Sequence, residues 1–124
     1  MKNPPNKYRP IPFWSWNDKL EPKELSRQAD MMADVGMGGY FMHARSGLVT
    51  EYLGDEWFEC IGEGIDSAHR NGMYPWAYDE NGWPSGFGGG IVNGMGIGYQ
   101  QKYLRMEDNN THPDTFICEC GGKS

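Results

Sequence analysis

Residues 73–86 decide the fold that we expect, and they read Met73-Tyr74-Pro75-Trp76-Ala77-Tyr78-Asp79-Glu80-Asn81-Gly82-Trp83-Pro84-Ser85-Gly86. An apolar, aromatic segment ends in two adjacent carboxylates, and glycine and proline follow immediately. This order is typical of a parallel strand that presents acid or base groups where it ends. An ordinary loop explains the same residues if Asp79 caps a helix and Glu80 lies in solvent.

Two strand–helix units precede this stretch. Residues 13–17 predict a short aromatic strand, and apolar residues at helical spacing predict a helix over 22–35. Residues 38–44 predict a second strand. Asp55 is the expected N-cap of a second helix, which ends at Asn71-Gly72. With the strand over 73–78, the order is strand, helix, strand, helix, strand.

Alternation of this kind predicts an α/β fold with a parallel sheet. We expect the first three β/α units of a TIM-type (β/α)8 barrel over residues 13–100, after an extended lead-in over 1–12. A glycine-rich loop over 88–98 and a β-hairpin over 101–124, the start of an insertion, should follow. Three strands cannot close a barrel, so the pattern fits a small open α/β domain or the N-terminal part of a larger protein. We expect the larger protein, with the remainder of the barrel in the full-length chain.

Composition excludes several functions. The 124 residues carry a formal net charge of −6 without a lysine or arginine block, which disfavours nucleic acid as a partner. No apolar run reaches the length of a membrane span, and the N-terminus lacks the apolar core of a signal peptide, so we expect a cytoplasmic protein. The spacing of His112, Cys118 and Cys120 does not fit a zinc site. The sequence therefore predicts no cofactor and identifies no metal-ligand set, while a calcium ion at an acidic rim stays open.

Side-chain alternation along the strands selects the candidate catalytic residues. Tyr78 and Glu80 share one face of the third strand, whereas Asp79 lies on the other. Glu80 is therefore the first candidate for proton transfer, and Asp79 is the second catalytic candidate or a brace for the turn. His43 and Arg45 share a face of the second strand and should emerge at the same rim, where they can bind hydroxyl groups.

The other substrate-binding candidates are aromatic or amide side chains near the strand ends. They are Trp14, Trp16, Asn17, Tyr78, Asn81 and Trp83. Aromatic faces stack against the C–H face of a sugar ring, and polar groups bind its hydroxyls. Other readings stay open, because the histidine can be structural, Arg45 can pair with Glu51 or Asp55, and the tryptophans of the first strand can belong to the core.

Three blocks in this order resemble α-L-rhamnosidase-like glycoside hydrolases. They are Pro12-Phe13-Trp14-Ser15-Trp16-Asn17, Gly38-Gly39-Tyr40-Phe41-Met42-His43-Ala44-Arg45-Ser46-Gly47-Leu48 and Tyr78-Asp79-Glu80-Asn81-Gly82-Trp83-Pro84-Ser85-Gly86. The resemblance runs from about residue 8 to 105 and covers only the first part of a family member. It implies the N-terminal end of a catalytic (β/α)8 barrel, a carbohydrate substrate, and carboxylate acid/base catalysis.

The resemblance also implies that this chain alone is an inactive fragment. Glycosidases need two carboxylates across the scissile bond, and the neighbours Asp79 and Glu80 point in different directions. A second hypothesis is a non-catalytic carbohydrate-binding module that uses aromatic stacking. A third is a phosphate or nucleotide binder, although the glycine-rich segments lack the spacing of the known phosphate-binding loops.

Overall fold

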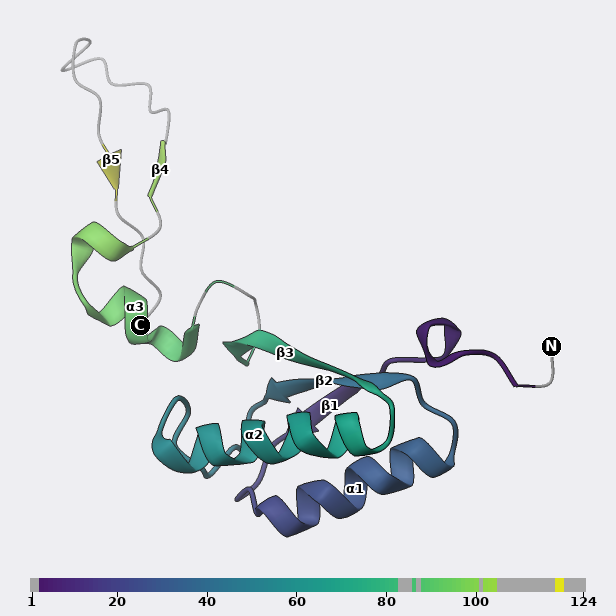
Figure 1. Cartoon of the computed structure of the whole chain (residues 1–124). Helices are drawn as coiled ribbons and strands as arrows, with labels where there is room; N and C mark the ends of the chain where they lie inside the picture. Colours follow the sequence, from purple (N-terminus) through teal and green to yellow (C-terminus); the bar gives the residue numbers. More distant parts are fainter. Residues whose placement is uncertain (1–2, 83–85, 87, 101, 105–117, 120–124) are drawn as a thin grey trace, which may run out of the picture.

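The computed structural model is an α/β structure built on a parallel sheet. It describes residues 3–82, 86, 88–100, 102–104 and 118–119. The sheet holds three strands in the order β1 (Phe13–Trp16), β2 (Gly39–Ala44) and β3 (Tyr74–Asn81). The connecting helices, α1 (Pro22–Asp34) and α2 (Asp55–Arg70), pack side by side on one face of the sheet, as Figure 1 shows.

The prediction of the first three units of a TIM-type (β/α)8 barrel is wrong. The described strands form an open sheet in which β1 and β3 are both edges, and no barrel unit is evident in the described part of the chain. Alternation of strands and helices predicts parallel pairing correctly, but open sheets and barrels share it. Closure depends on strand number, tilt and stagger, which the apolar pattern of the sequence does not encode.

Most element boundaries lie within one residue of those that the sequence predicts, and two differences bear on the candidate residues. Asp55 is the first residue of α2, and Gly54 occupies the N-cap. A carboxylate in the first turn still interacts favourably with the helix dipole. Strand β3 continues to Asn81, so Asp79 and Glu80 lie within the strand instead of after it.

The segment after β3 contains short elements where the sequence predicts a loop. They are η2 (Gly88–Gly90), α3 (Ile91–Gly94) and η3 (Ile97–Tyr99), while η1 (Asn6–Tyr8) lies near the N-terminus. Strands β4 (Tyr103–Leu104) and β5 (Cys118–Glu119) pair antiparallel.

The core lies between the sheet and the two helices. The face of the sheet that meets the helices, here called the helix face, carries Trp14, Trp16, Tyr40, Met42 and Ala44, all buried. The Trp16 ring packs edge-on against Trp57 of α2, with centroids 5.1 Å apart. Gly64 lets α2 approach the sheet closely, because a Cβ atom there would lie 2.5 Å from the sulfur of Met42.

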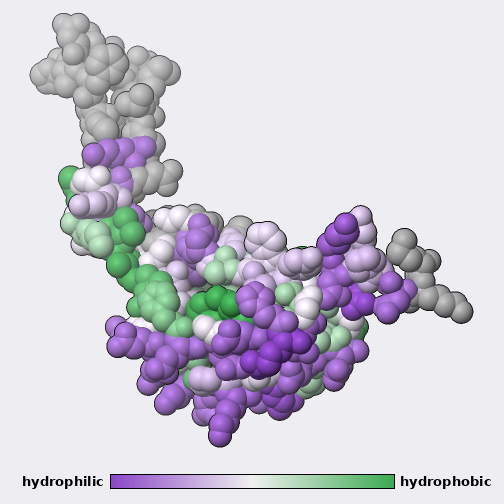
Figure 2. Space-filling model, viewed as in Figure 1, coloured by the Kyte–Doolittle hydropathy of each residue, from purple (hydrophilic) through white to green (hydrophobic). Residues whose placement is uncertain are grey.

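Surface hydropathy separates the helical layer from the rest of the molecule. Figure 2 shows hydrophilic residues over the two helices, and hydrophobic residues in a band that leads towards α3. Apolar side chains of this last region, including Ile91 and Met95, are exposed. Among the described residues, no helix is both long and apolar enough to cross a membrane.

Candidate functional site

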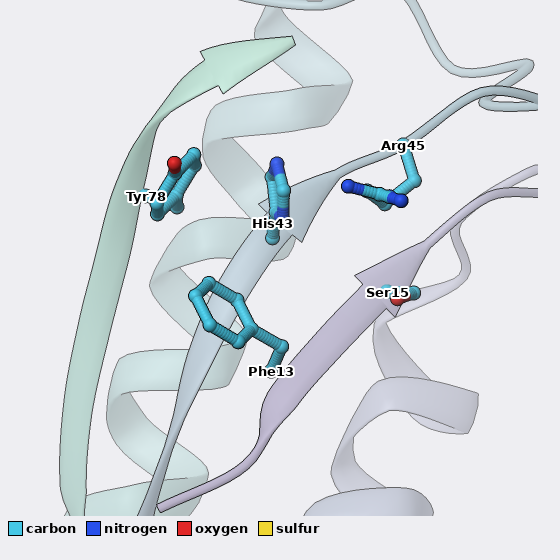
Figure 3. A pocket seen from close by; sticks show the side chains of 5 residues that line it. All are labelled: Phe13, Ser15, His43, Arg45 and Tyr78. Carbon is cyan, nitrogen blue, oxygen red and sulfur yellow. The ribbon is translucent and has the colours of Figure 1, made fainter. Parts of the chain in front are cut away.

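A pocket of about 260 Å³ lies on the side of the sheet away from the helices (Figure 3). Its lining residues come from all three strands and are Phe13, Ser15, His43, Arg45 and Tyr78. This face, here called the pocket face, carries Phe13, Phe41, His43, Trp76 and Tyr78. The alternation that buries the helix face therefore places a second aromatic set on the opposite side.

Strand register brings the lining residues together. Phe13 pairs with Phe41 and Ser15 with His43 across β1 and β2, while Phe41 pairs with Trp76 across β2 and β3. The register then shifts, because Met42 pairs with Ala77 but Ala44 pairs with Asn81. Strand β3 thus advances four residues where β2 advances two. Local irregularities of this kind re-aim side chains near strand ends.

The aromatic rings of the pocket contact one another. The rings of His43 and Tyr78 lie 4.1 Å apart between centroids, and Phe13 lies 5.6 Å from His43. Phe13 and Tyr78 meet edge-to-face at 5.5 Å with an interplanar angle of 74°. Two differently oriented ring surfaces therefore border the same hollow.

His43 joins the ends of β2 and β3. Its Nε2 lies 3.2 Å from the carbonyl oxygen of Gly82, and since a carbonyl only accepts hydrogen bonds, Nε2 carries the proton in this contact. The Gly82 N–H donates to Ala44 O at 3.0 Å. The left-handed φ of Gly82, +94°, suits a glycine at this position. His43 is only 3% exposed, so the backbone fixes its ring.

Arg45 follows β2 and stands on an ordered turn. Its N–H donates to Trp16 O, and its carbonyl accepts from the Leu48 N–H, both at 3.0 Å. Gly47 closes this turn against β1, because a Cβ atom there would lie 2.8 Å from Asn17 O. The guanidinium points towards His43 in Figure 3. The backbone thus positions the Arg45 guanidinium at the rim of the pocket.

The two adjacent carboxylates have different surroundings. Glu80 is fully buried and accepts hydrogen bonds from the N–H groups of Asn81, at 3.0 Å, and Gly88. These contacts tie the end of β3 to η2. Asp79 is exposed. Burial, followed by the negative charges of Glu80 and Asp79, raises the pKa of Tyr52, which indicates that this phenol lies near both carboxylates.

The structure does not place the predicted tryptophans in the pocket. Trp14 and Trp16 are 8% and 1% exposed and belong to the helix face, because the helices cover the side of β1 on which they lie. Their indole rings make T-shaped contacts, Trp14 with Tyr40 and Trp16 with Trp57. Trp14 and Trp16 therefore pack in the core of the described structure, and their stacking role stays a prediction.

The two amide candidates also lie outside the lining of the pocket. Asn17 borders a separate, polar hollow of about 320 Å³ between the end of β1 and the start of α1. Asn81 is half-buried, and its side chain lies against Gly89 of η2. Trp83 lies outside the described residues.

Phe13 and Ser15 are the pocket residues that sequence reasoning missed. Both alternate with the tryptophans of β1, and both pair in register with residues that share the pocket face. The alternation rule contained the signal, because it requires the two sets to face opposite sides. The prediction selected the tryptophans because of their larger rings.

A comparison with solved structures finds a likeness to a rhamnosidase. The chain resembles the structure of a rhamnosidase from Novosphingobium sp. PP1Y, with 24% sequence identity and a TM-score of 0.55. The match covers 67% of this chain and 9% of the rhamnosidase chain. At this identity the likeness concerns the fold alone. Neither a comparison with models of protein families nor one with curated proteins finds a match.

The described residues offer no evident metal site. In this part of the chain, no group of three or more His, Cys, Asp or Glu side chains could hold a metal ion. The chemistry that the pocket offers is ring stacking and hydrogen bonding.

Proposed function

We propose that this chain supplies a saccharide-binding pocket to a glycoside hydrolase related to rhamnosidases. The observation that carries the proposal is the juxtaposition, on one face of three parallel strands, of two aromatic rings with a histidine and an arginine from the carboxyl end of β2. Sugars need an apolar surface for their C–H face and polar groups for their hydroxyls. The fold likeness to a rhamnosidase supports the same class and suggests a rhamnosyl ligand.

The two carboxylates enter this proposal with different roles. Hydrolysis needs an acid and a base or nucleophile on opposite sides of the glycosidic bond. Asp79 is exposed and is the carboxylate that can reach a ligand, whereas Glu80 binds backbone N–H groups and holds η2 in place. Neighbours in one strand do not make an opposed pair, so we propose binding, and not turnover, for this chain alone.

A non-catalytic carbohydrate-binding module is the second candidate. It is favoured by the lining of the pocket, in which none of the described residues is a carboxylate. Such a module would bind the same sugars through Phe13 and Tyr78 without a role for Asp79.

Binding of a rhamnosyl disaccharide, followed by NMR titration, tests the proposal. We expect Phe13→Ala to weaken binding at least tenfold, because the stacking surface is lost. Phe58→Ala is the matched control, since Phe58 lies on α2 and is 57% exposed against 60% for Phe13. Equal affinities of the two variants, or no binding by the wild-type chain, would contradict a saccharide pocket at this place.

Turnover distinguishes the two candidates. In a longer protein that contains this chain and hydrolyses an aryl rhamnoside, Asp79→Asn should lower kcat at least a hundredfold and leave binding intact. A binding module predicts unchanged turnover in that variant. Glu80→Gln should lower the stability of the segment around η2, and amide hydrogen exchange at Gly88 would report that change separately from turnover.

A further inference from the structure

The charge of the pocket suggests which sugars it takes. Arg45 is the fixed charge among its lining residues, and no carboxylate from the described part of the chain lines it. The chain as a whole has 17 acidic residues against 11 basic ones. A cationic hollow on an acidic chain is therefore a local feature, and not a reflection of the composition.

The hydrogen bonds of the other arginines underline this feature. Arg27 pairs with Glu24 at 2.7 Å, Arg70 pairs with Glu63 at 2.9 Å, and Arg9 donates to Pro4 O and to the Asn3 side chain. Of the arginines in the described residues, Arg45 alone has no side-chain hydrogen bond or ion pair. Its guanidinium thus keeps its donors available for a ligand.

The backbone beneath Arg45 is ordered by contacts that do not involve its side chain. The hydrogen bonds to Trp16 O and from the Leu48 N–H fix the turn. A ligand that meets this side chain therefore gains a donor whose base is already positioned, which lowers the entropy lost on binding.

The neighbouring groups extend the arrangement around a sugar ring. Phe13 and Tyr78 offer ring surfaces, and Ser15 offers a hydroxyl that donates or accepts. His43 uses Nε2–H for Gly82 O, which leaves Nδ1 as the ring nitrogen that does not take part in this contact. The planar fork of an arginine matches a carboxylate by two parallel hydrogen bonds.

We infer that the pocket recognises an acidic sugar, a uronic acid unit whose carboxylate pairs with Arg45 while its ring stacks on Phe13 or Tyr78. This inference rests on the proposed saccharide pocket and specifies its substrate class. A disaccharide of rhamnose and such a uronic acid would also bind here, because its uronate carboxylate would pair with Arg45.

An oligogalacturonide and its fully methyl-esterified counterpart make a matched pair of probes, because they differ in charge but share ring, linkage and length. We expect the acid to bind at least tenfold more tightly than the ester at low salt. Arg45→Gln should remove that preference, and Arg45→Lys should restore part of it, because lysine keeps the charge but loses the fork. Arg27→Gln should leave both affinities unchanged.

The outcomes separate the inference from the proposed function. Equal binding of acid and ester, unaffected by Arg45→Gln, would overturn the acidic-sugar assignment and leave a saccharide pocket standing. If neither these probes nor the rhamnosyl disaccharide bind, the proposed function fails and the inference fails with it. Tighter binding of a sulfated galactan fragment would overturn the carboxylate assignment, and competition by acetate alone at equal strength would show a simple anion site. Circular dichroism of each variant shows that the fold is kept.

Discussion

Both faces of the sheet carry several aromatic residues, but these residues serve different ends. On the helix face, the rings of Trp14, Trp16 and Tyr40 pack against each other and against α2, and all are buried. On the pocket face, Phe13 and Trp76 are 60% and 51% exposed. The difference lies in what covers the strand, and it teaches that an aromatic residue in a strand indicates neither core nor site until its face is known.

The polar groups of the two faces differ in the same way. On the helix face, Trp14 Nε1 donates to Gln28 Oε1 at 2.9 Å and the Tyr40 hydroxyl donates to Gly64 O. On the pocket face, the Arg45 guanidinium has no protein partner among the described residues. These two donors of the helix face are thus satisfied within the protein, whereas the pocket face offers the Arg45 guanidinium outward.

Truncation of one ring on each face should give the largest difference in free energy of unfolding between the two faces. Trp16→Ala removes a side chain that is 1% exposed, and the loss of burial together with the cavity should cost about 3–5 kcal/mol in free energy of unfolding. Phe13→Ala, three residues away on the pocket face, should cost less than about 1 kcal/mol. Urea unfolding of both variants measures the difference.

A second core variant keeps this prediction testable if Trp16→Ala does not fold. Trp16→Phe preserves an aromatic ring and removes the indole N–H, which has no hydrogen-bond partner among the described residues. It should therefore be less destabilising than Trp16→Ala. Similar losses for Trp16→Ala and Phe13→Ala would show that the pocket face is covered in solution.

Alkaline pH should reveal the burial of Tyr40. Burial is the main cause that raises the pKa of Tyr40 to about 12, whereas tyrosine in an unfolded chain titrates near about 10. Between these values the unfolded chain loses the proton that the folded chain keeps, so the free energy of unfolding falls as the pH rises. At pH 9, the free energy of unfolding of Tyr40→Phe should be about 1 kcal/mol lower than that of the wild type, because the hydrogen bond to Gly64 O is lost.

The change of the free energy of unfolding with pH tests the burial of Tyr40 most directly. Stability of Tyr40→Phe should decline less between about pH 10 and 12 than stability of the wild type. Tyr8→Phe is the control, because Tyr8 is 69% exposed, and it should reproduce the wild-type slope. A parallel decline of all three proteins would contradict a buried, neutral Tyr40.

The smallest effects should come from the outer surface of the helices. Arg70 Nη2 donates to Ser26 Oγ at 2.8 Å and to Glu63 Oε1 at 2.9 Å, so it links α2 to α1. Arg27 pairs only within α1. We expect Arg70→Gln to lower the urea midpoint slightly, and by more than Arg27→Gln does, because exposed ion pairs within one helix contribute little.

Acid pH should reduce the contribution of Arg70 to stability. The hydrogen bond from Arg70 is the main cause that lowers the pKa of Glu63, so this contribution to stability is present above the ordinary pKa of glutamate and is lost as the pH falls. The gap between the wild type and Arg70→Gln should therefore narrow below about pH 4. A gap that stays constant would assign the effect to packing of the arginine stem.

Much of the local structure was predictable from short patterns. Apolar spacing located α1 and α2, and the aromatic runs located β1, β2 and β3, because helix and strand periodicities are local properties of the chain. Alternation also grouped His43 with Arg45 and Tyr78 with Trp76. It failed at β1, where the size of the indole rings outweighed the rule that the tryptophans and their neighbours face opposite sides.

The amino-acid pattern alone was thus sufficient to predict the order of the elements, their parallel pairing and the division of each strand into two faces. The three-dimensional structure was needed to show which face meets the helices, that the described strands form an open sheet, and that Glu80 accepts hydrogen bonds from the N–H groups of Asn81 and Gly88. The reason is that these features depend on contacts between residues far apart in the chain, such as Trp16 with Trp57 and His43 with Gly82. Such contacts leave no periodic trace in the sequence.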